Sequence, residues 1–236
     1  MQEQPVYTIF ALGDNALTID FCNDIDEAIN QKVLAWFHSL QENPMTGIIE
    51  AVPAYSSLTI YYDVLQAMKD KPVHKTAFEI MAERLEKRLR EPLPENLLSP
   101  PLIRIPVCYD PEFGLDIDEL AAAKGITAPD VIQIHVSAIY SVYMLGFLPG
   151  FSYMGKVADK IAMPRKTNPR TRVEAGSVGI AGHQTGIYPL TSPGGWQIIG
   201  RTPVKLFDTD NKELTLLMPG DKAQFYSISK DEFNSY

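Results

Sequence analysis

The sequence predicts two domains, a small α+β domain followed by a mainly-β barrel domain with long irregular loops. Residues 1–91 show strand and helix patterns in the order ββαββα, which is typical of one sheet with its helices packed on a single face. Four prolines fall within residues 91–101. Beyond them, ten of the fifteen glycines lie between residues 146 and 200, among short apolar runs, and this pattern indicates strands joined by turns.

The first domain opens with two β-rich runs, residues 6–12 and 16–22, separated by a Gly-Asp-Asn sequence that favours a hairpin turn. Asn23 or Asp24 is a suitable N-cap for a helix that runs to residue 41. The apolar residues of this helix are spaced to form one stripe: Ile29, Val33, Trp36, Phe37 and Leu40.

Two further strands are expected at residues 47–52 and 57–62, and a second helix over residues 73–90. The helix places its apolar residues on one face and its charges on the other. The first domain therefore covers residues 1–91. Residues 92–101 are predicted to form a linker, because proline fixes φ and removes backbone donors.

The second domain, residues 102–236, begins with a strand at 102–107. Two short helices are expected near residues 117–124 and 128–137, and the signals then change to strands and turns. The expected strands, which fit a closed or nearly closed β-barrel, are residues 140–145, 178–181, 197–199, 205–207, 213–217 and 223–228.

Composition excludes several classes of protein. Apolar residues make up 45% of the chain and charged residues 21%, so wholesale disorder is excluded. The sequence has no apolar run long enough for a membrane span, and its start does not have the pattern of a secretory signal. Cys22 and Cys108 are expected to be buried, reduced residues, and we therefore expect a cytoplasmic protein.

The charge is unevenly distributed along the chain. The net charge of −8 argues against a dedicated nucleic-acid-binding protein. Residues 156–205, however, contain eight basic residues against Asp159 and Glu174, a balance of +6 that leaves −14 for the rest. This segment is either a solvated basic face or an anion-binding region.

The common catalytic and nucleotide-binding motifs are absent from the sequence. It contains neither the G-x-x-x-x-G-K-[ST] phosphate loop nor a G-x-S-x-G nucleophile elbow. The four histidines are isolated from one another and from the cysteines, so we expect no metal site in this chain.

Four blocks rich in Gly, Pro and aromatic residues stand out, at 143–155, 164–173, 175–189 and 192–203. With the Gly-Asp-Asn-Ala-Leu run at residues 13–17 and the run at residues 55–63, they extend over nearly the whole chain. The sequence resembles the family that includes the B subunit of bacterial 5-oxoprolinase (PxpB), the kinase inhibitor KipI and proteins called allophanate hydrolase subunit 1.

The resemblance implies a cyclophilin-like β-barrel for the second domain and work within a complex. PxpB-like chains pair with a PxpC-like (or KipA-like) subunit and a PxpA-like subunit. Together these cleave 5-oxo-L-proline to L-glutamate at the expense of ATP. A KipI-like chain is the alternative, and it binds a sensor histidine kinase and blocks its autophosphorylation. A prolyl isomerase follows only from the barrel fold and has no motif in its favour.

Arginines are the main candidates for binding the substrate. A lactam resists hydrolysis, and its activation by ATP requires donors for the substrate carboxylate and for the transferred phosphoryl group, a role suited to guanidinium forks. The candidates are Arg165, Arg170, Arg172 and Arg201, and the alternative for each is an exposed surface arginine. Arg201 is also taken as catalytic.

Other candidates come from the same blocks. Phe147, Phe151 and Trp196 are interpreted either as a pocket wall or as core residues. Gly194 and Gly195 serve either ligand approach or backbone conformation. His183 is the candidate acid or base. Gln184 is a candidate catalytic residue. Gln184 and Tyr188 either form hydrogen bonds to the lactam or form them within their own loops.

Overall fold

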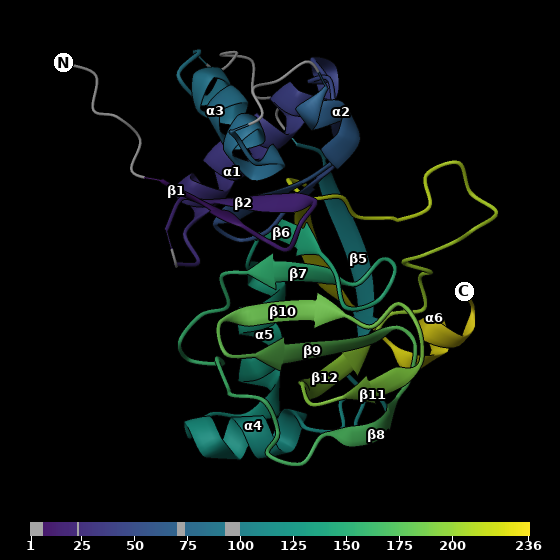
Figure 1. The fold of residues 1–236 in the computed structure, drawn as a ribbon. Helices are drawn as coiled ribbons and strands as arrows, with labels where there is room; N and C mark the ends of the chain where they lie inside the picture. Colours follow the sequence, from purple (N-terminus) through teal and green to yellow (C-terminus); the bar gives the residue numbers. More distant parts are fainter. Residues whose placement is uncertain (1–6, 23, 70–73, 93–99) are drawn as a thin grey trace. The chain divides into compact units, whose positions relative to one another are not determined.

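A computed structural model of the chain describes residues 7–22, 24–69, 74–92 and 100–236 (Figure 1). Its internal contacts divide the chain into two compact units, residues 1–99 and 100–236. Most of the predicted linker, residues 93–99, lies outside the described residues. No helix among the described residues has the length and apolar character needed to cross a membrane.

Unit 1 contains a four-stranded antiparallel sheet with the strand order β1-β2-β4-β3. The hairpin between the first two strands contains Gly13 at φ +70°, a conformation that glycine adopts without a steric penalty. The strands are β1 (Thr8–Ala11), β2 (Ala16–Asp20), β3 (Ile48–Pro53) and β4 (Ser57–Tyr62).

Three helices accompany this sheet, and side chains cap each at its start. Asp26 accepts a hydrogen bond from the N–H of Ile29, and Thr76 forms a capping box with Glu79. The short helix α2 was not expected from the sequence; its cap is Asp63. The helices are α1 (Glu27–Glu42), α2 (Val64–Met68) and α3 (Ala77–Leu89).

The core of unit 1 lies between the sheet and its helices. Leu17 and Ile19 of β2 are fully buried, in one cluster with Trp36 of α1 and Met81 of α3. Because alternate strand residues point to the same side of a sheet, α1 and α3 cover a single face. This is the arrangement that the ββαββα pattern predicts.

Unit 2 contains a closed barrel in the order β10-β7-β6-β13-β5-β12-β9. The first and last strands of the barrel in sequence, β5 and β13, pair in parallel; the other pairs are antiparallel. In Figure 1, β7, β10 and β9 lie side by side. The strands are β5 (Leu102–Cys108), β6 (Tyr140–Leu145), β7 (Ser152–Gly155), β9 (Ser177–Ala181), β10 (Gln184–Ile187), β12 (Gln197–Arg201) and β13 (Lys222–Ile228). A separate two-stranded sheet consists of β8 (Arg170–Val173) and β11 (Ser192–Gly194).

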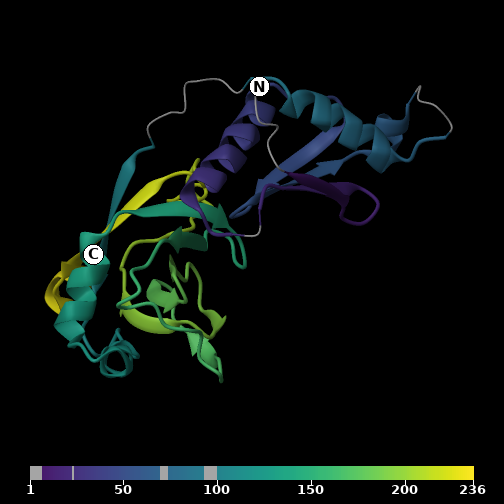
Figure 2. The same ribbon diagram turned by 90° about the vertical axis from the view of Figure 1, so that its left-hand side faces the viewer.

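Three helices complete unit 2. They are α4 (Ile117–Lys124), α5 (Ala128–Ser137) and α6 (Lys230–Asn234). The Gly125 C-cap, at φ +66°, ends α4, and a Thr127–Asp130 capping box starts α5. Figure 2 shows α4 and α5, in teal, beside the strands of unit 2.

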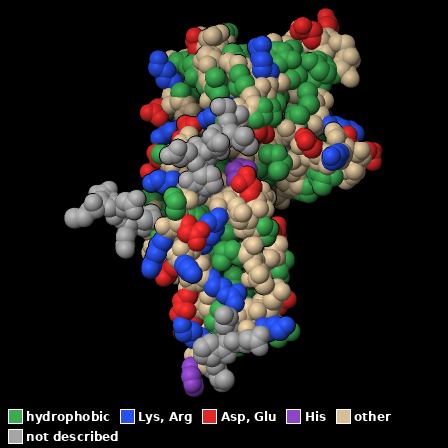
Figure 3. Space-filling view, turned by 90° about the horizontal axis from the view of Figure 1, so that it is seen from above, with side chains coloured by type: hydrophobic (Ala, Val, Ile, Leu, Met, Phe, Trp, Pro, Cys, Tyr) green, Lys and Arg blue, Asp and Glu red, His purple; other side chains and the backbone are tan. Residues whose placement is uncertain are grey.

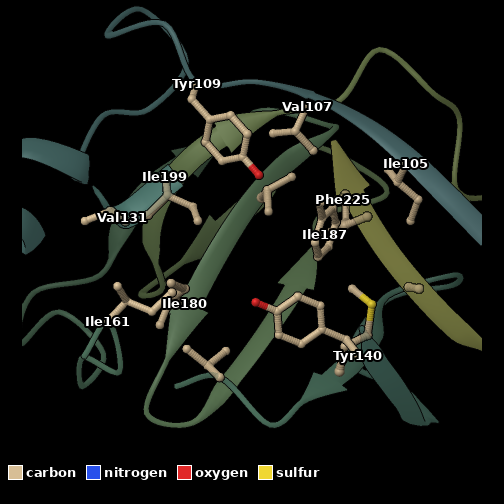
Figure 4. Packing of buried hydrophobic residues seen from close by; sticks show 14 of the residues in the cluster. Ile105, Val107, Tyr109, Val131, Tyr140, Ile161, Ile180, Ile187, Ile199 and Phe225 are labelled. Carbon is tan, nitrogen blue, oxygen red and sulfur yellow. The ribbon is translucent and has the colours of Figure 1, made fainter. Parts of the chain in front are cut away.

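The barrel interior is mainly apolar and contains a hydrogen-bonded chain centred on His135. Figure 4 shows the hydroxyls of Tyr109 and Tyr140 within this packing. His135 is fully buried; its Nδ1 lies 2.8 Å from the Tyr109 hydroxyl and its Nε2 lies 3.0 Å from Thr185 Oγ1. Thr185 donates to the carbonyl of Gly179, so it accepts from Nε2–H, and Nδ1 accepts from Tyr109. Burial lowers the pKa of His135 to about 3.

The structure corrects several expectations. Residues 205–207 and 213–217 do not form strands; Phe207 and Thr215 form an isolated bridge between them. Strands β7, β8, β10 and β11 were not expected, because they are short and rich in glycine or polar residues. Cys108 is buried as expected, but Cys22 is exposed.

Candidate functional site

An aromatic cluster lies on the outer side of the barrel wall. Phe151 packs edge-on against Tyr188 and Trp196, with ring centres 5.2 and 5.4 Å apart. All three side chains are at most 4% exposed. They form an apolar group separate from the barrel interior, so Phe151 and Trp196 are core residues of this outer cluster.

Arg165 lies beside this cluster. Its guanidinium carbon lies 5.9 Å from the centre of the Trp196 ring, a geometry that attracts a cation to an aromatic face. The indole lies over β10, where a Cβ on Gly186 would be 3.0 Å from the ring. The pKa of the Tyr153 hydroxyl is raised, because the effect of burial exceeds the opposite effect of the Arg165 charge.

Phe147 extends the cluster to the surface. Its side chain is 61% exposed, and its backbone has φ +67°, a region that non-glycine residues rarely adopt. Its ring still contacts Phe151 and Tyr188 edge-on, at 5.5 and 6.4 Å between centres. The exposed ring therefore continues a buried aromatic group.

The loop that carries Arg165 is fixed to the start of β12. The N–H of Lys166 donates to the carbonyl of Gly195 at 2.7 Å, and Gln197 Nε2 donates to the carbonyl of Pro164 at 2.8 Å. Gly194 is needed for close packing, because a Cβ there would be 2.3 Å from the Tyr188 hydroxyl.

Arg170 and Lys166 are engaged by a buried acid that the sequence analysis missed. Asp116 is 1% exposed and accepts two hydrogen bonds from Arg170 and one from Lys166. Burial alone would raise the pKa of Asp116, but these bonds and the N–H of Ile198 hold it below its usual value. Asp116 directly precedes α4 and looks like an ordinary helix cap in the sequence, so no local signal distinguishes it.

The other two arginines have different surroundings. Arg172 is 71% exposed and pairs with Glu174. Arg201, at the end of β12, donates from Nε to the carbonyl of Ala175 at 2.8 Å and lies over the Phe233 ring of α6. Arg201 also lines a pocket of about 280 Å³. The four predicted arginines thus differ in their hydrogen-bond and ring partners, and their joint role in binding an anion stays a prediction.

The three predicted catalytic residues are also apart. His183 and Gln184 follow β9, whereas Arg201 pairs with Ser177 at the start of that strand. A five-residue strand is about 13 Å long. The His183 side chain is 47% exposed, and its Nδ1 lies 3.5 Å from Asp159. The catalytic roles of His183, Gln184 and Arg201 stay predictions.

Two of the predicted site arginines in unit 2 lie over an aromatic ring. One is Arg165 over Trp196, just before β12, and the other is Arg201 over Phe233, at the end of β12. Figure 3 shows acidic and basic side chains interspersed on the face seen from above, without a continuous stripe of one sign. Of these two arginines, Arg201 is the one that lines a pocket.

The family model described as "Carboxyltransferase domain, subdomain C and D" matches residues 7–217. This chain belongs to that family. It is 43% identical to the 5-oxoprolinase B subunit of Bacillus subtilis over 98% of this chain and 96% of the relative. It is 39% identical to the 5-oxoprolinase B subunit of Haemophilus influenzae over 84% of this chain and 88% of the relative.

A solved structure supports the fold of this carboxyltransferase-domain chain. The protein TTHA0988 matches with a TM-score of 0.77 and 35% identity, over 91% of this chain. This chain spans 40% of that longer one. The family match covers strands of both units, the Arg165–Trp196 pair and Arg201. Phe233, the ring beside Arg201, lies in α6 beyond residue 217.

Proposed function

We propose that this chain is the PxpB-type component of an ATP-dependent 5-oxoprolinase complex. The complex would cleave 5-oxo-L-proline to L-glutamate while ATP is hydrolysed to ADP and phosphate. The observation that carries the proposal is the near full-length similarity to relatives named as 5-oxoprolinase B subunits. We also propose, as the resemblance implies, a cyclophilin-like barrel, a cytoplasmic location, and PxpC-like and PxpA-like partner subunits.

The described helices of this chain lack the common phosphate cradle of ATP-binding proteins. That cradle is a glycine-rich loop at the start of a helix. Helices α1, α3, α4 and α5 each begin after Asp or Thr, with no run of glycines before them. We therefore assign ATP to partner subunits or to a site shared with them.

The contribution of this chain is binding of the small acid. Arg165 and Arg201 are the predicted anion-binding residues that form no ion pair with a carboxylate among the described residues. Guanidinium forks bind carboxylates in two-point geometry. Because each arginine lies against an aromatic ring, it is held in place for that task, and a partner subunit would supply the remaining groups.

Reconstitution tests the function. This chain, mixed with its PxpA-like and PxpC-like subunits, 5-oxo-L-proline and ATP, is expected to form L-glutamate and phosphate in equal amounts. Mixtures that lack any one subunit are expected to form neither. Glutamate formation by the other two subunits without this chain would contradict the proposal.

A KipI-like kinase inhibitor is the second candidate. The exposed ring of Phe147 favours it, because an exposed aromatic residue backed by a buried cluster suits docking to another protein. If the reconstituted mixture is inactive and this chain abolishes autophosphorylation of a sensor histidine kinase, the inhibitor replaces the enzyme subunit as the function.

A further inference from the structure

We propose that the pocket between α6 and the segment after β12 binds a small carboxylate, with Arg201 recognising its acid group. The pocket has a volume of about 280 Å³, and its lining includes Arg201, Lys205, Pro203 and Phe233. Pockets for drug-sized ligands begin at about 300 Å³, so this one suits a smaller acid. The proposal rests on the proposed function, since it names where the acid group of 5-oxo-L-proline binds.

Arg201 is oriented for this role. Its Nε–H donates to the carbonyl of Ala175 at 2.8 Å, and its guanidinium carbon lies 5.9 Å from the centre of the Phe233 ring. Its two Nη groups have no hydrogen-bond partner among the described residues. A carboxylate presents two oxygens to such a pair of donors, which gives a planar, two-point contact.

The acids near this pocket are already engaged. Glu174 accepts hydrogen bonds from Arg172 and Thr191, and the bonds from Arg172 lower its pKa, with a smaller effect from Arg201. Lys205, at the rim, pairs with Asp208 at 3.5 Å. The Nη edge of Arg201 is therefore not neutralised by a salt bridge within the described chain.

One wall of the pocket comes from α6. The Phe233 ring is supported by the Phe113 ring, with centres 4.5 Å apart. An ion pair between Lys230 and Glu112 also ties α6 to the segment after β5. The wall gives the bound acid a flat apolar surface beside the cation, which favours an acid with a compact, flat body over an extended one.

Close backbone packing also builds part of the pocket lining, at Gly176 and Thr202. Gly176 has φ +84°, and a Cβ there would be 2.3 Å from the carbonyl oxygen of Thr202. The N–H of Thr202 donates to the carbonyl of Gly176 at 2.9 Å, and the N–H of Gly176 donates to that of Tyr188 at 2.7 Å. The backbone that carries Arg201 is thereby fixed.

Calorimetric titration of the full chain with three ligands tests the site. They are 5-oxo-L-proline, its neutral amide, and the homologous six-membered lactam acid. We expect the acid to bind at least tenfold more tightly than the amide, because a charge-assisted contact is lost. We expect it to bind at least tenfold more tightly than the larger ring, because the pocket rejects an added methylene.

Variants locate the binding. Arg201→Ala and Arg201→Lys are each expected to weaken binding of the acid at least tenfold, and Phe233→Ala to reduce the preference for the smaller ring. Arg104→Ala is the matched control, because Arg104 also stacks on an aromatic ring, that of Tyr226, but does not line the pocket. This variant should bind 5-oxo-L-proline with the affinity of the wild-type chain. The thermal midpoint of each variant reports folding.

Three results would overturn the proposal. They are no binding by the isolated chain at concentrations up to about 10 mM, equal binding of acid and amide, or wild-type affinity in both Arg201 variants. These results are independent of the proposed function, because the reconstituted complex can still produce glutamate with its acid site elsewhere. Conversely, binding without turnover by the complex supports the pocket and contradicts the enzyme function.

Discussion

Asp116 and Arg170 form an ion pair in which both carboxylate oxygens accept from the guanidinium group, at 2.8 and 2.6 Å. The same carboxylate accepts from Lys166 at 2.9 Å and from the N–H of Ile198 at 2.7 Å. A single buried acid therefore joins the start of α4, the loop before β8 and strand β12. Through Lys166, Asp116 adds a side-chain contact to the backbone bonds that hold the Arg165 loop.

Replacing Asp116 should destabilise unit 2. Asp116→Ala leaves Arg170 and Lys166 without their shared counter-charge, and we expect a loss of about 3–5 kcal/mol in the free energy of unfolding. Glu119→Ala, which removes an exposed partner of Lys166, is expected to cost less than about 1 kcal/mol. Urea unfolding followed by Trp196 fluorescence in a Trp36→Phe background measures both, and equal losses would contradict the prediction.

The buried His135 should make stability depend on pH. Its pKa is about 3 in the folded state against 6.5 when unperturbed, so the unfolded state binds the extra proton between these values. Stability is therefore complete above pH 6.5 and falls as the pH is lowered. We expect a loss of about 2 kcal/mol between pH 7 and 5 from this residue. His135→Gln should be less stable at pH 7 but lose less over that interval; an unchanged pH dependence would contradict the prediction.

Adjacent glycines at 194 and 195 should respond differently to alanine. At Gly194 a Cβ would be 2.3 Å from the hydroxyl of the buried Tyr188, and we expect a loss of about 1–3 kcal/mol from overpacking. At Gly195 the Cβ would lie 3.5 Å from Pro169, an ordinary contact, and the loss should stay within about 1 kcal/mol. Thermal unfolding of the two variants measures both losses, and equal losses would contradict the prediction.

The two phenylalanines of the outer cluster should also differ. Phe151→Ala removes a ring that is 1% exposed, and we expect a loss of about 3–5 kcal/mol. Phe147→Gly removes an exposed ring and relieves a positive φ, so stability should hold or rise. Urea unfolding measures both changes, and a large loss in Phe147→Gly would show that this ring supports the fold.

Most of the helices follow from the sequence, because their apolar spacing and capping residues are local signals. The predicted ranges 117–124 and 128–137 coincide with α4 and α5. Strands β7 and β10 were missed because their pairing within the barrel, not their own propensity, makes them strands. Residues 205–207 and 213–217 are the opposite case. They are apolar enough to predict strands, but they form only the isolated bridge between Phe207 and Thr215.

The candidate site was less predictable than the fold. The sequence pointed to arginines 165, 170, 172 and 201, but it did not show which would meet an acid within the chain. Asp116 lies 54 residues from Arg170, and Phe233 lies far beyond the motif blocks that contain Arg201. Both pairings are set by tertiary contacts, and no local pattern encodes them.

The parallel pair of β5 and β13 has a consequence for biosynthesis. Because β13 is inserted between β5 and β6, the nascent chain cannot close the barrel until residue 228 has left the ribosome. Unit 1, whose four strands all end by Tyr62, can fold before then. Until closure, β5 and β6 each have an unpaired strand edge, and such edges promote aggregation. Premature termination before β13 would therefore produce an aggregation-prone fragment and not a smaller closed barrel.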